Sequence, residues 1–197
     1  MNEDKARLRR EMVARRDAIP AAERSRLAAA LTDKVTSLPQ YAAARSVLAT
    51  LAIGSEWSTR EFIERSRTAG KTVVLPRVTA LPRHLELHAV EDFERDLVPG
   101  VWDIPEPDPA RCPRVDFAQV DFALVPALAI DRGGYRLGYG AGYFDRLLAG
   151  RGKVPYCVTA LPSAFVVERL PREAHDAAVD LVVNESGPAG PQREGNP

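Results

Sequence analysis

The sequence has few cysteines and no long apolar segment, and both absences narrow the kind of protein it describes. Its 197 residues include only two cysteines, Cys112 and Cys157, in unlike sequence contexts. That gives little support to a disulfide framework or a cysteine-ligated metal. No apolar run approaches the roughly 18 residues of a spanning helix, and residues 1–5 carry no apolar signal-peptide core. We therefore expect a cytoplasmic protein that does not use a membrane.

Net charge is also absent, because 27 basic residues are balanced by 27 acidic ones. A neutral chain argues against a protein whose main task is to bind a nucleic-acid backbone. The charge is uneven, however, since residues 1–26 hold eight Lys and Arg against five Asp and Glu. Such a segment could attract a small anion. We therefore expect small-molecule substrates and no nucleic-acid partner.

The length and the apolar pattern are typical of an α/β domain with one core. Hydrophobic residues make up 45% of the chain and charged residues 27%, the balance of a globular protein. Apolar spacing predicts two N-terminal helices, over 3–19 and 21–38, with Pro20 between them. Short apolar runs then alternate with helical spacing, which predicts a largely parallel sheet with ligands beyond the carboxyl ends of its strands. The predicted strands are 46–52, 72–75, 85–90, 123–130, 154–160 and 179–183, and a further helix is predicted over 59–69.

Two stretches lack regular secondary-structure signals. Residues 99–113 are rich in proline and predict an extended connecting loop packed by its own apolar residues. Residues 186–197 are rich in glycine and proline, and we expect them to form a disordered C-terminal tail. The remaining residues, 1–185, are expected to form a single domain.

The segment from Arg136 to Arg146, with the sequence RLGYGAGYFDR, is the most informative part of the chain. It follows the apolar run 122–130, and its three glycines stand at alternate positions before a predicted helix. Glycines there let backbone N–H groups approach a phosphate at the positive end of the helix, with Arg136 available for charge pairing. The segment is not a Walker loop, and Tyr143 stands where the dinucleotide fingerprint has its third glycine. The residues alone leave an anion site and a flexible turn both open.

Aromatic and acidic residues near this segment could complete a phosphate site. Tyr139 and Tyr143 either stack on a flat ligand or pack the turn. Asp145 either holds a Mg²⁺ that bridges phosphate oxygens or is an acidic residue favoured in the first turn of a helix. Asp180, just before Leu181, either adds a second carboxylate or belongs to a turn. The sequence has no Gly-x-Ser-x-Gly elbow, which leaves phosphate chemistry as the favoured class.

Three further charged residues acquire a role only if a ligand is present. Lys5 and Arg9 share one face of the predicted first helix, where charges are ordinarily solvated. Glu56 follows the first predicted strand, so it either lies beyond that strand's carboxyl end or belongs to a surface loop. Both interpretations stay open for each of these residues.

Eight segments match the pattern of a known family in one colinear order, from about residue 4 to residue 185. They are residues 5–9, Leu51 with Glu56, residues 101–107, 125–126, 136–146, 170–171, 175–176 and 179–180. In these segments the chain resembles the 5-formyltetrahydrofolate cyclo-ligases, also called 5,10-methenyltetrahydrofolate synthetases. The resemblance implies an open three-layer α/β/α fold with a largely parallel sheet, of the kind shared with sugar-phosphate isomerases and CoA-transferases.

The resemblance also implies a reaction, in which ATP is a co-substrate and Mg²⁺ a cofactor. The formyl oxygen of 5-formyltetrahydrofolate takes the γ-phosphoryl group, N10 attacks the activated carbon, and 5,10-methenyltetrahydrofolate forms as phosphate leaves. ADP is the second product. Such a transfer depends on positioning and charge neutralisation more than on a protein nucleophile. We expect the protein to act as a monomer or a weak homodimer.

Individual roles follow from the resemblance by position. Arg136 and Tyr143 are implied as catalytic, and Asp145 and Asp180 as the metal ligands. The implied ATP-binding residues are Lys5, Arg9, Arg136, Gly138, Tyr139, Gly140, Ala141, Gly142, Tyr143 and Phe144. The implied folate-binding residues are Leu51, Glu56, Trp102, Tyr139 and Tyr143. A carboxylate suits the donor-rich edge of a pterin, and aromatic side chains suit its ring.

Three positions depart from the family's usual pattern. Phe144 stands where a second tyrosine is frequent, Phe165 or a neighbour where a glutamine is frequent, and Ile130 where an aromatic residue is usual. None of these changes removes a phosphate or metal group, so the activity is expected to persist. Two alternatives remain: a non-catalytic folate- or nucleotide-binding paralogue, and a phosphosugar isomerase or transferase on the same fold that needs no ATP.

Overall fold

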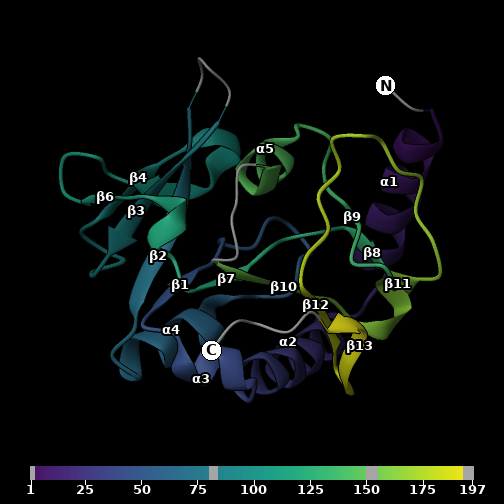
Figure 1. Ribbon diagram of the computed structural model, residues 1–197, viewed down its shortest axis with the longest axis horizontal. Coiled ribbons are helices and arrows are strands. Elements are labelled where there is room, and N and C mark those ends of the chain that lie inside the picture. Colours follow the sequence, from purple (N-terminus) through teal and green to yellow (C-terminus); the bar gives the residue numbers. More distant parts are fainter. Residues whose placement is uncertain (1–2, 80–83, 150–154, 193–197) are drawn as a thin grey trace.

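An eight-stranded sheet forms the centre of the computed structural model, which describes residues 3–79, 84–149 and 155–192. Its strands are β1 (Ser46–Leu48), β2 (Thr72–Val78), β3 (Leu85–Val90), β6 (Arg114–Val115), β7 (Phe122–Leu124), β10 (Tyr156–Ala160), β12 (Leu181–Asn184) and β13 (Gly187–Gln192). They lie in the order β13-β12-β10-β7-β1-β2-β3-β6 (Figure 1). The five strands from β12 to β2 are parallel, whereas β13 and β3 run antiparallel to their neighbours. The predicted largely parallel sheet is confirmed.

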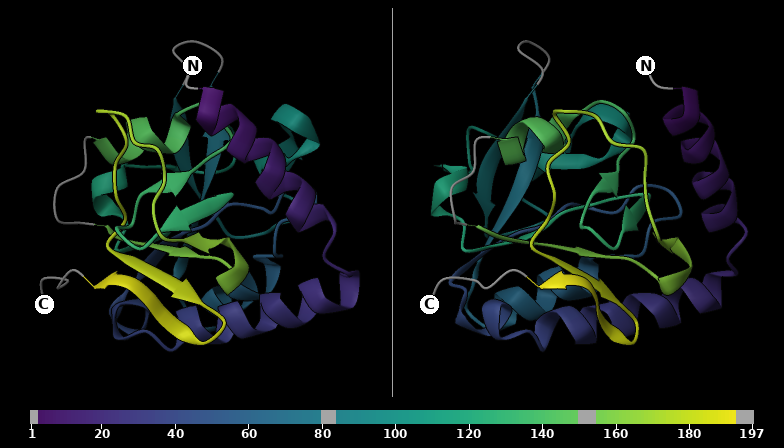
Figure 2. Two further views of the ribbon diagram at one scale, coloured as in Figure 1. Left: turned by 90° about the vertical axis from the view of Figure 1, so that its right-hand side faces the viewer. Right: turned by 45° about the vertical axis from the view of Figure 1, so that its right-hand side comes forward.

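Helices and two small sheets complete the three layers. The helices are α1 (Glu3–Asp17), α2 (Ala21–Thr36), α3 (Pro39–Ala43), α4 (Arg60–Thr68) and α5 (Tyr143–Ala149), with 3-10 turns at Val101–Asp103, Phe117–Gln119 and Ser163–Phe165. One small sheet pairs β4 (Leu97–Pro99) with β5 (Pro105–Pro107), and the other joins β8 (Ala129–Asp131) to β9 (Arg136–Leu137) and β11 (Val166–Val167). Helices α2 to α4 cover one side of the central sheet, whereas α1, α5 and the β8-containing sheet lie on the opposite side (Figures 1 and 2).

The central sheet separates two hydrophobic cores, as the alternation of side chains along a strand requires. Val73 and Leu75 of β2 pack in the core beneath α2 to α4, whereas Val74 between them packs in the core beneath α1. Phe122 and Ala123 of β7 divide in the same way. Because the central strands are buried on both faces, their sequences are apolar throughout rather than alternating.

Several predicted boundaries differ from the structure; the strand predicted over 46–52 ends at Leu48, and the strand predicted over 179–183 begins at Leu181. The predicted strand 123–130 is two strands in different sheets, β7 and β8, because Pro126 lies between them and has no N–H to continue a ladder. The predicted helix 21–38 ends at Thr36, and the separate helix α3 begins at Pro39. The start of the predicted strand 154–160 lies outside the described residues, and the structure begins this strand at Tyr156.

The expectation of a disordered tail is wrong for residues 187–192. These residues form β13, which pairs antiparallel with β12 through Asn184 and Gly187. Gly187 has a φ of +128°, which allows the tight reversal between the two strands. The glycines and prolines that suggested disorder belong instead to a strand at the edge of the sheet, where proline is tolerated. Residues 193–197 lie outside the described part of the chain.

Candidate active site

Two adjoining cavities beyond the carboxyl ends of the central strands are lined by most of the predicted site residues. The first, which we call the turn cavity, has a volume of about 330 Å³ and is lined by Lys5, Arg9, Pro126, Arg136, Leu137, Gly138, Gly140, Gly142, Tyr143, Phe144, Asp145, Glu173, His175 and Asp176. The second, the strand-end cavity, has a volume of about 120 Å³, and its lining includes all five predicted folate-binding residues: Leu51, Glu56, Trp102, Tyr139 and Tyr143. Pro126, Tyr143 and Phe144 line both cavities. Two ligands bound there would meet at this shared wall.

The glycine turn adopts a backbone that explains its composition. Gly140 and Gly142 have φ values of +101° and +68°, a region that L side chains rarely adopt. A Cβ on Gly140 would lie 3.3 Å from the guanidinium carbon of Arg9, so a side chain there would also crowd α1. Arg9 Nε donates to the carbonyl oxygen of Gly138 at 2.8 Å. Helix α5 begins directly after the turn, at Tyr143, as the sequence predicts.

Lys5 also lines the turn cavity, where it lies between two carboxylates. Its ammonium nitrogen donates to Glu173 Oε2 and Asp176 Oδ2, both at 2.7 Å, and its side chain is only 6% exposed. Burial lowers the pKa of Lys5, but the bonds and charges of the two carboxylates outweigh burial and raise it overall. Burial raises the pKa of Asp176, and the bond from Lys5 reverses this effect and lowers it. The cavity therefore holds a buried cation that is already paired with anions.

These pKa shifts predict how the Lys5 contacts depend on pH. A lysine whose pKa is raised by folding stabilises the fold fully at pH values below its unfolded pKa of about 10.4. An aspartate whose pKa is lowered by folding stabilises the fold fully at pH values above its unfolded pKa of about 3.9. We expect Lys5→Met to lower the free energy of unfolding by about 1–3 kcal/mol near neutrality. The difference from the wild type should be constant between about pH 5 and 9 and should shrink as the pH falls below about 4 toward the lowered pKa of Asp176. Thermal unfolding of both proteins between about pH 3 and pH 9 measures this difference. A difference that is as large at pH 3 as at pH 7 would contradict the assignment.

Arg136 is buried and binds two protein groups rather than facing the cavity as a free cation. It donates to Asp145 Oδ1 at 2.7 Å and to the carbonyl oxygen of Ala177 at 2.8 Å. Its side chain is 2% exposed, against 24% for Asp145. Burial lowers the pKa of Arg136, while the charge of Asp145 acts in the opposite direction. The arginine thus links α5 to the segment after Leu170 and orients Asp145 at the edge of the turn cavity.

Only one of the two predicted metal ligands lines the turn cavity. Asp145 lines the turn cavity, but Asp180 is not among its lining residues. Asp180 stands at the amino end of β12, and its Oδ2 accepts a hydrogen bond from the backbone N–H of Cys157 at 2.8 Å. An aspartate that precedes a parallel strand lies at the edge of the sheet opposite the carboxyl ends, where ligands bind. The carboxylates that do face Asp145 across the turn cavity are Glu173 and Asp176.

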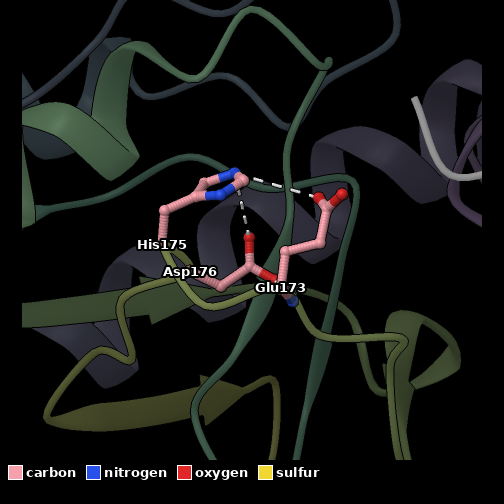
Figure 3. Close-up of side chains that lie close together, drawn as sticks. All are labelled: Glu173, His175 and Asp176. Atoms are coloured by element: carbon pink, nitrogen blue, oxygen red, sulfur yellow. Dashed lines mark hydrogen bonds and ion pairs between the residues drawn. The ribbon is translucent and has the colours of Figure 1, made fainter.

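Glu173, His175 and Asp176 form a compact group of possible metal-ligating side chains (Figure 3). One ligand atom from each lies within 4.8 Å of the others. The His175 Nε2 atom is 3.8 Å from Glu173 Oε2 and 4.0 Å from Asp176 Oδ1, and its ring is largely exposed. Carboxylate oxygens are the donors that Mg²⁺ prefers, and the Lys5 ammonium already occupies a cation position beside them. The residues of the turn cavity therefore fit a hard divalent cation.

Trp102 has an unusual backbone at the mouth of the strand-end cavity. Its φ is +59° and that of Asp103 is +58°, a costly conformation for residues with side chains. The indole is 61% exposed, and its ring lies 6.4 Å from that of Tyr143 in an edge-on arrangement. An exposed aromatic held in a strained turn is typical of a ligand-contacting position. A flat ligand ring could pack against this pair.

Glu56 projects into the same cavity and is held by three groups. Its Oε2 accepts from the backbone N–H of Ile53 at 2.9 Å, and its Oε1 accepts from the Tyr139 hydroxyl at 2.5 Å. Arg16 Nη1 lies 3.6 Å from the same Oε1. Burial, followed by the charge of Glu56, raises the pKa of Tyr139, so the phenol stays protonated as a donor. Glu56 is thus a carboxylate with a fixed direction.

Among the titratable residues that line the two cavities, Glu106, Glu173, His175 and Asp176 carry no role in the sequence-based prediction. Arg16, which lines neither cavity but donates to Tyr139, carries none either. Helical spacing could have indicated Arg16, because it lies 7 residues after Arg9 and therefore near the same helix face. No local pattern marks Glu106, whose buried carboxylate accepts from the backbone N–H of Val78 at 3.3 Å.

The three positions that depart from the family pattern are all packed. Phe144 lines both cavities, so its ring contributes to their shared wall. Ile130 is fully buried, and Phe165 is 3% exposed with the Arg15 guanidinium 5.7 Å from its ring centre. The side chains at these positions thus pack in the core or form part of the cavity walls.

Comparisons with known proteins point to one family. The sequence model of the 5-formyltetrahydrofolate cyclo-ligase family matches residues 1–185. A 5-formyltetrahydrofolate cyclo-ligase from Mycolicibacterium smegmatis is 31% identical over 181 residues, which cover 91% of this chain and 92% of the relative. One from Mus musculus is 29% identical over 197 residues, covering 96% and 97% of the two chains.

Solved structures agree with this similarity. The NMR structure of Aquifex aeolicus 5,10-methenyltetrahydrofolate synthetase matches with a TM-score of 0.83 and 32% identity, covering 98% of this chain and 95% of the other. A Mycoplasma pneumoniae 5,10-methenyltetrahydrofolate synthetase, at a TM-score of 0.73 and 21% identity, shares the fold. In the part of the chain that the structure describes, no helix is both long and apolar enough to cross a membrane.

Proposed function

The chain belongs to the 5-formyltetrahydrofolate cyclo-ligase family, and we propose that it uses ATP to close 5-formyltetrahydrofolate to 5,10-methenyltetrahydrofolate. The observation that carries the proposal is the pair of cavities that share Pro126, Tyr143 and Phe144. One cavity is lined by glycine backbone and carries the basic side chains of Lys5, Arg9 and Arg136 beside three carboxylates, a set that suits phosphates together with a cation. The other is largely apolar and carries a fixed carboxylate, which suits a pterin.

The turn cavity would bind the phosphates of ATP. Gly138, Gly140 and Gly142 line it with backbone that carries no side chain of its own, and Lys5 and Arg9 supply positive charge from α1. On binding, the phosphates would compete with Glu173 and Asp176 for the Lys5 ammonium. Since phosphoryl transfer depends mainly on charge neutralisation and alignment, these groups are sufficient for the protein's part in the step.

The strand-end cavity would bind the folate. Glu56 would accept hydrogen bonds from the donor-rich edge of the pterin, and Trp102 and Tyr143 would pack against flat rings. Tyr143 lines both cavities, so the formyl oxygen and the γ-phosphate would meet beside it. The oxygen of the formyl group takes the phosphoryl group, and phosphate departs when N10 attacks the same carbon. The pocket walls would exclude water from this intermediate.

Asp145 and Asp176 would hold Mg²⁺, with Asp176 in place of the Asp180 that the sequence suggested. Both face the turn cavity, and their carboxylates match the preference of this ion for one or two protein oxygens together with phosphate oxygens. When bound, Mg²⁺ neutralises the charge that accumulates on the transferring phosphoryl group. Arg136 would orient Asp145, and Lys5 would balance Asp176 until the ion and ATP are both present.

One assay tests the proposed function and its alternatives together. Purified protein is mixed with 5-formyltetrahydrofolate, ATP and Mg²⁺, and the absorbance of the methenyl product is followed. We expect product to form at a rate that depends on ATP and falls when Mg²⁺ is removed with a chelator. Folate binding without product would favour the non-catalytic paralogue, and a folded protein that neither binds nor converts the folate would favour a sugar-phosphate enzyme.

A further inference from the structure

Arg16 connects the end of α1 to the strand-end cavity. Its Nε donates to Ser55 Oγ at 2.9 Å, and its Nη1 donates to the Tyr139 hydroxyl at 2.8 Å. Its side chain is 11% exposed, as is that of Glu56 at 3.6 Å. Ser55 in turn donates to Asp17, the last residue of α1. The Arg16 guanidinium is therefore the centre of a network that includes four other side chains: Asp17, Ser55, Glu56 and Tyr139.

The order of donors and acceptors in this network fixes the direction of the Glu56 carboxylate. Arg16 donates to the oxygen of Tyr139, and that hydroxyl donates its own proton to Glu56 Oε1. A donor that is itself polarised by a cation makes a stronger bond to a carboxylate. Arg16 thereby maintains a carboxylate of defined orientation in a partly buried site.

Arg16 contacts the wall of the strand-end cavity from behind: it lines neither that cavity nor the turn cavity, but a smaller one of about 40 Å³ together with Ser55 and Glu56. Lys5 and Arg9, on the same helix, line the turn cavity, whereas Arg16 does not. The Tyr139 hydroxyl that Arg16 contacts lies on the folate side, since Tyr139 lines the strand-end cavity. Loss of Arg16 should therefore affect a ligand in the strand-end cavity and leave the binding of phosphates largely unchanged.

We propose that Arg16 is a positioning residue for folate recognition, which acts through Tyr139 and Glu56 without touching the substrate. This inference rests on the proposed role of Glu56 as the acceptor for the pterin. A substrate donor pair would bind Glu56 only if both carboxylate oxygens keep their direction. Arg16 supplies the charge and the hydrogen bond that keep Oε1 in place while the backbone of Ile53 holds Oε2.

The test is a double-mutant cycle between Arg16→Met and Glu56→Gln. The dissociation constant of 5-formyltetrahydrofolate is measured by calorimetry in the absence of ATP, and that of ATP with Mg²⁺ is measured separately. We expect Arg16→Met to weaken folate binding about 10-fold, which corresponds to about 1.4 kcal/mol, and to change ATP binding less than about 2-fold. In the Glu56→Gln background, the same substitution should weaken folate binding less than about 2-fold.

A matched control is Arg10→Met, which removes an exposed arginine from the same helix and should leave both dissociation constants unchanged. Equal losses of folate and ATP binding, or a full 10-fold loss in the Glu56→Gln background, would overturn the proposal and indicate a structural role. If Arg16→Met does not fold, Arg16→Lys decides the question. Its single ammonium cannot reproduce both contacts, so folate binding should weaken about 3-fold, and wild-type binding would count against the proposal.

The failure of this inference can be told apart from the failure of the proposed function. Wild-type protein that binds 5-formyltetrahydrofolate and converts it, while Arg16→Met does so equally well, would overturn the role of Arg16 alone. Wild-type protein that neither binds nor converts the folate would overturn the proposed function.

Discussion

Asp176→Asn is expected to reduce kcat/KM at least about 100-fold, a loss of about 2.7 kcal/mol of transition-state stabilisation. Asp176 faces the turn cavity and pairs with Lys5 at 2.7 Å. The substitution removes a charge from the proposed cation site without changing the size of the side chain. Steady-state kinetics at several Mg²⁺ concentrations measures the effect, and the apparent Mg²⁺ requirement should rise together with the loss of rate.

Asp180→Asn is the matched comparison, four residues away and equal in chemistry. Its Oδ2 accepts from the backbone N–H of Cys157, and an asparagine oxygen can accept that bond too. We expect a stability loss of about 1 kcal/mol and a change in kcat/KM of less than about 3-fold. A large kinetic effect at Asp180 with a small one at Asp176 would restore the sequence-based choice of ligand and contradict the geometry.

Arg136→Met is expected to destabilise the fold and to weaken ATP binding more than folate binding. The substitution leaves Asp145 and the carbonyl oxygen of Ala177 without the guanidinium that binds them. Breaking a fully buried pair costs about 3–5 kcal/mol. Because Asp145 is 24% exposed, water offsets part of the loss, and we expect about 2–3 kcal/mol. The selective effect on ATP follows because Arg136 lines the turn cavity and not the strand-end cavity.

Urea unfolding gives the stability change, and calorimetric titration with each substrate gives the binding changes. Arg132→Met is the control, since Arg132 forms an exposed pair with Glu168 at 3.3 Å; exposed pairs contribute about 0–1 kcal/mol. Equal losses of ATP and folate binding in Arg136→Met would show that the arginine supports the whole site rather than the turn cavity.

The sequence was sufficient to predict the sheet and the glycine turn because both depend on local patterns. Apolar runs are typical of parallel strands covered on both faces, and glycines at alternate positions indicated the turn in which Gly140 and Gly142 have positive φ. The five folate-binding residues that the resemblance implied all line one cavity. Their roles in binding stay predictions, but their convergence is what a binding site requires.

The contact of Asp176 with Lys5 and that of Arg16 with Tyr139 could not be predicted from local patterns. Asp176 and Asp180 are both close to the end of the chain's similarity to the family, and only the fold shows which one faces Lys5, 171 residues earlier. The Arg16 contact with Tyr139 likewise spans 123 residues. Such long-range pairs depend on how α1 docks, which neither propensity nor periodicity determines. The edge strand β13 was missed because its composition is typical of disorder.

The most direct test of the central claim follows the oxygen of the formyl group. The protein is given 5-formyltetrahydrofolate labelled with ¹⁸O in that position, together with unlabelled ATP and Mg²⁺, and the inorganic phosphate is analysed by mass spectrometry. If the formyl oxygen takes the γ-phosphoryl group and leaves with it, one ¹⁸O atom should appear in each phosphate released. Unlabelled phosphate alongside the methenyl product would contradict phosphorylation of the formyl group, and with it the meeting of the two substrates at the shared wall.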